Sequence, residues 1–267
     1  MLSYTFMQRA LLGGMLVALI APLMGTFVVV RRMSLIGDSL SHVALSGVVL
    51  AALLGTEPVY GALGITLIGS WFIFFLREKY KEYEEISLAV IMSTGIALAS
   101  VLMGFSRNIR GNFLSYLFGS VSAITTSDIY LMIVLSLVIL LFIWKYYYKL
   151  FHMSFDEESA RAMGIEVDLI GKIFIFLIAF TVVISMRIVG VLLISSMMII
   201  PVATAMQISK SFKETIIYGI IIAMVSVYGG ITSSFYFDLP SGGSIVLISV
   251  FILMISCLLY TSPSPRD

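Results

Sequence analysis

Long apolar runs separated by short polar clusters dominate the chain. A helix needs about 20 mostly apolar residues to cross a bilayer. The pattern predicts nine such helices, over residues 9–30, 33–54, 59–76, 87–105, 128–148, 169–186, 188–208, 214–236 and 243–260. The first run is long enough to span and lacks the small-residue cleavage site of a signal peptide, so we interpret it as a retained helix. The predicted fold class is an all-α, polytopic transmembrane bundle of eight or nine spans.

Two stretches do not fit a lipid-facing helix. The stretch "FLSYLFGSVSAITTSD" (113–128) is short and rich in Ser and Gly, so we expect a short helix or re-entrant piece packed against protein. Residues 261–267 form a polar tail that we expect to be frayed or non-native. The remaining residues, 1–260, are predicted to form a single transmembrane domain.

Composition and charge exclude several classes of protein. Hydrophobic residues make up 60% of the chain and charged residues 12%, and the net charge is +1. We therefore expect membrane lipid as a partner and no nucleic acid. The single cysteine, Cys257, leaves no intrachain disulfide and no Cys-based zinc site.

The distribution of basic residues predicts the orientation, because Lys and Arg near helix ends stay on the cytoplasmic side. With the N-terminus outside, twelve of the sixteen Lys and Arg residues lie in inner loops. The four left outside are Arg9, Arg107, Arg110 and Arg187. Losing or gaining one span would reverse the first half.

The second predicted helix contains two ionisable side chains, Asp38 and His42. They are four residues apart and so share one face, which Ser34 and Ser46 extend by one turn at each end. If this helix leaves the inner interface at Arg32, Asp38 lies about 9 Å and His42 about 15 Å into a hydrocarbon layer of ~30 Å. Such a polar stripe must face protein, water or a transported solute.

Two interpretations of this pair differ in function. Asp38 and His42 could hydrogen-bond to each other or to a neighbouring helix and only fix the packing. At this depth a solute pathway is favoured, and an imidazole nitrogen with a carboxylate suits Zn²⁺, Mn²⁺ or Fe²⁺. Two ligands are too few for a tight site, but a symmetric dimer would supply two His and two Asp.

Three stretches of the chain carry a family resemblance. The run "VVVRRMSLIGDSLSHVALSGVVL" resembles the membrane permeases of the zinc/manganese/iron ABC importer family, in which an Arg-rich entry precedes a G-D-x-x-S-H segment. "VGVLLISSMMIIPVATA" (189–205) and "YFDLPSGGSIVL" (236–247) are similar to the same family. The resemblance covers nearly the whole chain in order and spacing.

The resemblance implies a function, a location and partners. It implies a permease subunit in a bacterial or archaeal plasma membrane that moves a divalent transition metal into the cytoplasm. It further implies a homodimer, two cytoplasmic ATPase subunits, an extracytoplasmic metal-binding protein, and metal contacts by Asp38 and His42. The metal would be cargo, with no permanently bound cofactor, and the chain itself would be a transport subunit and not an enzyme.

One inner loop resembles the coupling helix of that family. The sequence lacks a G-x-x-x-x-G-K-[ST] phosphate loop, so a partner would have to supply that kind of ATP site. "SFDEESARAMG" predicts a helix at about 154–164 with Ser154 as N-cap, acidic residues in the first turn and Gly164 as C-cap. The implied ATPase-coupling residues are Asp156, Glu157, Ala160 and Gly164. An ordinary solvated loop helix is the alternative.

Two functional questions stay open at this point. A gradient-driven transporter or channel, in which Asp38 and His42 relay protons, would use the same residues without an ATPase. The same two ligands serve zinc, manganese and iron, so the metal stays open as well.

Overall fold

The structure is a computed structural model that describes residues 4–79, 84–105, 115–120, 122 and 124–260. Across these ranges, nine helices are long and apolar enough to cross a membrane. They are α1 (Thr5–Val30), α2 (Leu35–Leu54), α3 (Pro58–Lys79), α4 (Glu84–Gly104), α6 (Thr126–Phe155), α8 (Val167–Ser185), α9 (Ile194–Ile208) together with the preceding 3₁₀ helix η3 (Val191–Leu193), α10 (Phe212–Phe237) and α11 (Ser241–Tyr260). The predicted all-α bundle is confirmed in its nine-span form.

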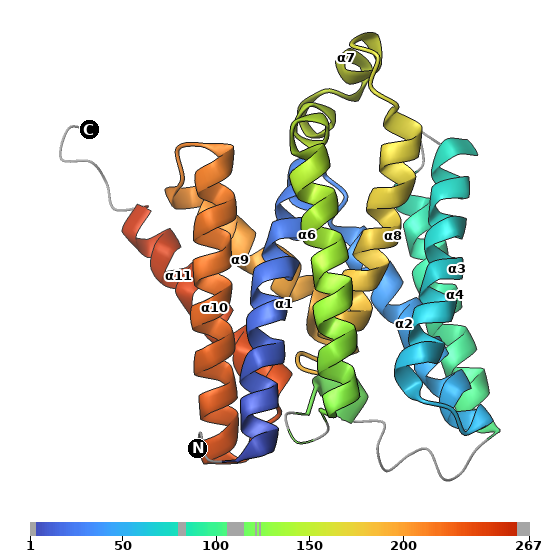
Figure 1. The fold of residues 1–267 in the computed structure, drawn as a ribbon, viewed down its shortest axis with the longest axis vertical. Coiled ribbons are helices and arrows are strands. Elements are labelled where there is room, and N and C mark those ends of the chain that lie inside the picture. Colours follow the sequence, from blue (N-terminus) through green and yellow to red (C-terminus); the bar gives the residue numbers. More distant parts are fainter. Residues whose placement is uncertain (1–3, 80–83, 106–114, 121, 123, 261–267) are drawn as a thin grey trace.

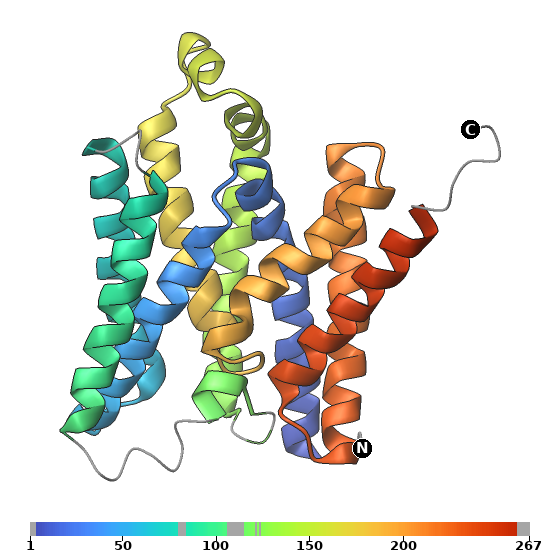
Figure 2. The same cartoon turned by 180° about the vertical axis from the view of Figure 1, so that it is seen from behind.

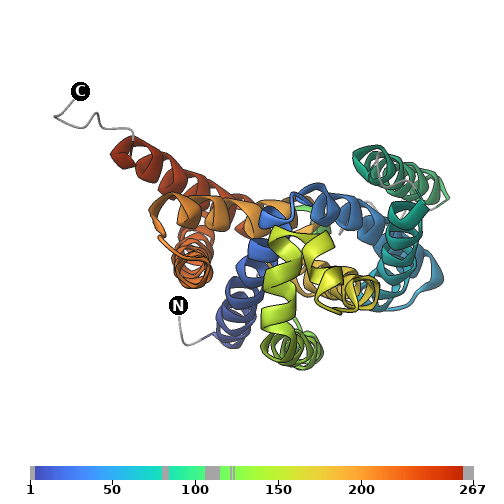
Figure 3. The same ribbon diagram turned by 90° about the horizontal axis from the view of Figure 1, so that it is seen from above.

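The helices form an elongated row. The central part consists of α1, α6 and α8, with α2, α3 and α4 on one side and α9, α10 and α11 on the other (Figures 1 and 3). From behind, α2 and α9 slope across the bundle (Figure 2). The short helix α7 (Glu157–Ala162) lies beyond one end of the bundle, and the N-terminus lies at the opposite end (Figure 1). The orientation in the membrane remains a prediction; if α7 is cytoplasmic, the N-terminus is outside.

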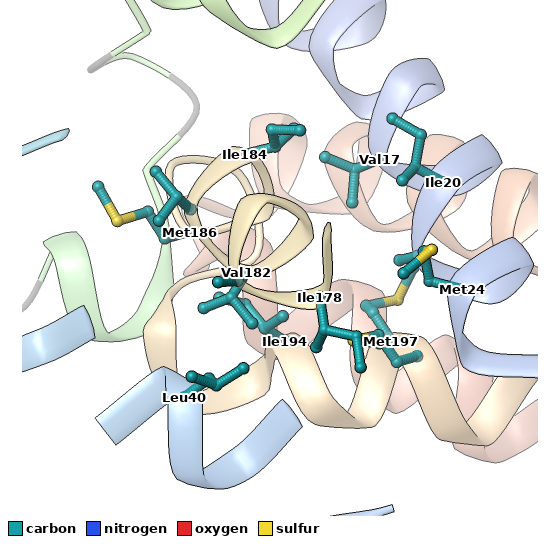
Figure 4. Packing of buried hydrophobic residues seen from close by; sticks show 14 of the residues in the cluster. Val17, Ile20, Met24, Leu40, Ile178, Val182, Ile184, Met186, Ile194 and Met197 are labelled. Atoms are coloured by element: carbon teal, nitrogen blue, oxygen red, sulfur yellow. The ribbon is translucent and has the colours of Figure 1, made fainter. Parts of the chain in front are cut away.

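A buried core joins the central helices to α2 and α9. Figure 4 shows residues of α1 and α8 meeting the start of α9, with Leu40 of α2 against the same cluster. The side chains in this contact are at most 1% exposed: Val17, Ile20, Met24, Leu40, Ile178, Val182, Ile194 and Met197. This core fixes one face of α2 and leaves another face to carry polar groups.

The region of the predicted coupling helix differs from expectation. Helix α6 runs to Phe155, seven residues beyond the predicted end at 148. Ser154 is therefore not an N-cap, because its hydroxyl donates to the carbonyl of Leu150 inside α6, 2.7 Å away. Phe151 and Phe155 pack on Phe212 of α10, with ring centroids 5.1 and 6.1 Å away, and this contact extends α6.

Asp156 is the actual N-cap of α7. Its Oδ1 accepts hydrogen bonds from the backbone N–H groups of Glu158 and Ser159 at 3.0 and 3.1 Å. Gly164 follows the helix with a φ of +79°, a backbone conformation that glycine adopts without strain. Helix α7 ends at Ala162 with Met163 as its C-cap residue, so the predicted C-cap Gly164 lies one residue beyond the cap. The helix is also shorter than the predicted range 154–164.

The stretch at 113–128 lies only partly within the described residues. Residues 115–118 form one helical turn. The backbone N–H of Ser120 donates to the carbonyl of Arg187 at 3.3 Å, so this piece packs against protein, as expected. The predictions for Arg107, Arg110 and the tail at 261–267 fall outside the described residues.

Candidate functional site

Asp38 and His42 lie in the first half of α2. The helix begins at Leu35, so Asp38 is in its first turn and His42 is one turn further along. Ser34 is the N-cap residue, although its side chain makes no capping hydrogen bond.

These polar residues define an open face of α2. Ser34, Asp38 and His42 are half-buried, whereas Leu40 and Val43 on other faces are buried. The four-residue spacing therefore places the three polar side chains together, as the sequence predicts. Ser46, one turn further on, is 1% exposed and donates to the carbonyl of Val43 at 2.7 Å. The stripe is thus open at its first three positions and enclosed at the fourth.

The polar atoms of this face are incompletely hydrogen-bonded. Oδ1 of Asp38 accepts a hydrogen bond from the hydroxyl of Ser195 in α9, 3.2 Å away. Nδ1 of His42 is buried and has no hydrogen-bond partner within the described part of the chain. Buried polar atoms are normally paired, so packing alone does not account for this nitrogen. A carboxylate and an imidazole with free lone pairs are suitable ligands for a divalent transition metal.

Sequence reasoning did not single out Ser195. The available signal was the Ser195–Ser196 pair inside the apolar run of α9, but its contact with Asp38 depends on how α9 crosses α2. Over the described ranges, no group of three or more His, Cys, Asp or Glu side chains lies close enough to hold a metal. Within a single chain, the candidate ligands are therefore Asp38 and His42, with the Ser195 hydroxyl beside them.

Helix α4 supports α2 directly behind His42. A Cβ atom at Gly95 would lie 2.8 Å from both the carbonyl carbon of His42 and the backbone nitrogen of Val43. The two helices therefore meet backbone to backbone, which is the usual role of small residues between membrane helices. This contact fixes where the His42 side chain leaves α2.

We expect Gly95→Ala to destabilise the protein, because the new methyl group forces α2 away from α4 at His42. Overpacking of this kind typically costs about 1–3 kcal/mol of stability. The matched control is Gly64→Ala in α3, where an added Cβ meets nothing within 4 Å. Unfolding in detergent measures the loss of stability, and equal results for both variants would contradict the assigned contact.

Helix α7 presents acidic side chains to solvent. Asp156 and Glu157 are exposed at the start of α7, and Gly164 is exposed just after its end. Ala160, in contrast, is fully buried against its own chain, so its small side chain serves packing within that chain. The Ser159 hydroxyl and backbone N–H donate to Asp156, and these hydrogen bonds lower the pKa of its carboxyl.

Capping by Asp156 is expected to persist at neutral pH. Because folding lowers the pKa of Asp156, the stabilisation is complete above the carboxyl's unfolded pKa and is lost only as the pH falls through the lower folded value. Asp156→Ala should speed amide hydrogen exchange in α7 at pH 7 by about fivefold, as for a typical lost N-cap. Asp156→Asn keeps an acceptor oxygen and should retain the protection. Equal exchange in both variants would exclude the capping role.

A buried cation lies at the end of the bundle opposite α7. Arg187, between α8 and the 3₁₀ helix η3 (Val191–Leu193), is 7% exposed. Its Nη2 lies 3.4 Å from Oδ1 of Asp128 and 3.6 Å from Oε2 of Glu57. Its Nη1 donates to the hydroxyl of Tyr116 at 3.4 Å. The sequence predicts Arg187 as a charge in an outer loop and gives no sign of this cluster.

The fold and the site together define a class of protein. Among the described residues, nine helices are apolar and long enough to cross a membrane, and the open face of one of them, α2, carries ionisable side chains. Ionisable residues within membrane spans mark solute or ion pathways. The class is a polytopic membrane transport protein.

Comparison with known proteins identifies the family. Residues 3–260 match the ABC 3 transport family. The chain is 33% identical to the high-affinity zinc uptake system membrane protein ZnuB of Haemophilus influenzae, over 92% of this chain and 95% of the relative. It is 30% identical to the manganese import system permease protein ScaB of Streptococcus gordonii, over 99% and 94%.

A solved structure agrees with the sequence relatives. A chain in the structure of PsaBC from Streptococcus pneumoniae in complex with Fab matches with a TM-score of 0.84 and 30% identity. The match covers 95% of this chain and 91% of that chain. The protein therefore belongs to the ABC 3 transport family, as a membrane permease of the metal-transport type. The resemblance noted in the sequence and the permease fold are both confirmed.

Proposed function

We propose that the protein is the permease subunit of an ABC importer that moves a divalent transition metal into the cytoplasm. A separate ATPase would supply the energy, and an extracytoplasmic binding protein would deliver the metal. Membership of the ABC 3 transport family and two relatives named for zinc uptake and manganese import support this proposal. Its location would be the plasma membrane of a bacterium or archaeon.

One observation carries the assignment of the site. Asp38 and His42 share the open face of α2, and Nδ1 of His42 is buried with no partner among the residues described. Asp38 accepts one hydrogen bond, from Ser195, at the moderate distance of 3.2 Å. Both side chains therefore keep lone pairs that could replace part of the ion's hydration shell. An incomplete ligand set suits conduction, since a transported ion must be released as well as bound.

A second copy of the chain would complete the site. An open face with a carboxylate and an imidazole cannot face lipid at low cost, so another surface must cover it. A two-fold dimer with α2 beside its axis would bring together two Asp38 and two His42 side chains, enough for four-coordinate binding. Ser34 would line the same passage toward α7. Ser46 would line it only if α2 moved, because Ser46 is enclosed in this structure.

The metal is zinc, manganese or iron in this proposal. Imidazole and carboxylate bind all three, and selectivity depends on geometry and on metal availability. The two named relatives differ in their metal, which agrees with a ligand pair common to both.

Reconstitution tests the proposed function. The permease, its ATPase and its binding protein would be placed in proteoliposomes, and uptake of Zn²⁺, Mn²⁺ and Fe²⁺ measured with and without ATP. We expect uptake that requires ATP. We also expect the ATPase activity to be stimulated when the binding protein carries one of the three metals. Uptake driven by a proton gradient in the absence of the ATPase would instead support the relay alternative for Asp38 and His42.

A further inference from the structure

The link between α1 and α2 is a short, hydrogen-bonded turn. Arg32 adopts a φ of +57°, which is uncommon for a residue other than glycine. The backbone N–H of Met33 donates to the carbonyl of Val28 at 2.9 Å, and that of Ile36 donates to Met33 at 3.0 Å. Met33 itself is 2% exposed. Because the turn is bonded to both helices, displacement of the link displaces the first turn of α2, where Asp38 lies.

The side chain of Arg31 joins this link to α7. Nη2 of Arg31 lies 3.5 Å from Oε2 of Glu157, and the Arg31 side chain is only 5% exposed. The guanidinium carbon lies 5.8 Å from the ring centroid of Phe174 in α8, so the cation rests against an aromatic face. An arginine buried to this degree is sensitive to the position of its carboxylate partner.

Glu157 belongs to a wider network of charges. Its Oε1 lies 3.7 Å from Arg161, and Arg161 donates to Asp168 in the first turn of α8 at 2.9 Å. The hydrogen bonds from Arg161 to Asp168 raise the pKa of Arg161. The carboxylate of Glu157 is thus shared between an arginine on its own helix and an arginine on the link to α2. Movement of α7 would change the position of this carboxylate relative to Arg31.

We propose that the Arg31–Glu157 ion pair transmits the movement of α7 to α2, so that the state of the ATPase sets the position of Asp38 and His42. Arg31 is a positioning residue in this scheme and does not contact the metal. If α7 moves while the link stays in place, Arg31 loses a partner in a buried position, which is unfavourable. The link therefore follows α7, or the pair breaks and a second arrangement becomes populated. This inference rests on the proposed function, in which α7 contacts the ATPase.

The test follows movement at both ends of the pair. In a Cys257→Ser background, one spin label is placed through Leu35→Cys, at an exposed position of the first turn of α2, and another through Glu158→Cys on α7. Spectra of the complete complex in proteoliposomes are compared without nucleotide and with ATP plus vanadate. We expect both labels to respond to nucleotide when Arg31 is present. With Arg31→Gln, the α7 label should still respond and the α2 label should not.

Functional measurements provide a second readout. Arg31→Gln should lower metal uptake per ATP hydrolysed by about tenfold, within the usual range of coupling effects. Arg31→Lys keeps the positive charge and should restore much of the coupling. The matched control is Arg32→Gln, which removes an exposed positive charge from the same turn and should leave the coupling unchanged. If Arg31→Gln fails to assemble, Glu157→Gln tests the same pair from α7 and should give the same loss.

The outcomes separate the inference from the function on which it rests. A nucleotide response of the α2 label that persists in both Arg31→Gln and Glu157→Gln would overturn the inference while leaving an ABC importer in place. The absence of any ATP-dependent response with Arg31 and Glu157 intact would overturn the proposed function itself, and the inference with it.

Discussion

His42→Ala is expected to lower metal uptake by the reconstituted complex by about 100-fold, the upper end of what loss of a supporting metal contact costs. The reason is that alanine removes the buried imidazole nitrogen that has no protein partner in the described structure. Asp38→Ala is expected to have a similar effect, because it removes the carboxylate from the same open face of α2. Initial rates of uptake at several metal concentrations provide the measurement.

The control for this pair lies on another face of α2. Ser41 is 1% exposed, and its hydroxyl donates to the carbonyl of Gly37 at 2.7 Å within the helix. Ser41→Ala should therefore leave uptake close to that of the unmodified protein. If His42→Ala and Asp38→Ala transported metal as well as Ser41→Ala, the assignment of the site would be wrong.

Arg187→Met is expected to destabilise the protein by about 3–5 kcal/mol, the cost of breaking a buried ion pair by removing one partner. The side chain of Asp128 is 9% exposed, so its carboxylate would lose the guanidinium at 3.4 Å without gaining full access to water. Its Oδ2 would still accept hydrogen bonds from the backbone N–H and hydroxyl of Thr125. Unfolding of the purified protein by titration with a denaturing detergent measures the loss.

Two further variants show whether burial causes this effect. Glu57→Gln removes the partner whose side chain is 70% exposed, and it should cost less than about 1 kcal/mol, as for surface ion pairs. Adding Asp128→Asn to Arg187→Met removes both buried charges and should recover part of the stability. A cost for Glu57→Gln equal to that for Arg187→Met would show that burial is not the deciding factor.

The spans could be predicted from the sequence because each apolar run is long enough to form a helix across the membrane. Helix α6 was the exception, since its last turns depend on Phe151 and Phe155 packing on Phe212 of α10. These contacts join residues far apart in the chain, and a local pattern cannot show them. The same extension turned the predicted N-cap Ser154 into an interior residue of α6.

The candidate site could be predicted in part. Spacing alone placed Asp38 and His42 on one face, because residues four apart in a helix share a face. Spacing could not show that Ser195 of α9 contacts Asp38, or that Nδ1 of His42 lacks a partner within the described residues. Both facts depend on how α9 and α4 cross α2.

Ser46 and Ala160 also differ from expectation because packing between distant parts of the chain decides their burial. Ser46 shares the polar face of α2 by its spacing, yet α3 encloses the helix at this level, where Gly47 approaches Gly61 closely. Ala160 was expected to face a partner, yet it is buried against its own chain. Small side chains permit close approach, but the sequence does not specify which surface approaches.

X-ray absorption spectroscopy of the zinc-loaded permease tests the central claim most directly. It reports which atoms surround the ion, without requiring transport. We expect a first shell of nitrogen and oxygen ligands with the outer-shell scattering of imidazole, and we expect the imidazole signal to disappear in His42→Ala. If the unmodified protein showed no imidazole scattering, the claim that α2 holds the transported metal would be contradicted. The same claim would be contradicted if the imidazole scattering were unchanged in His42→Ala.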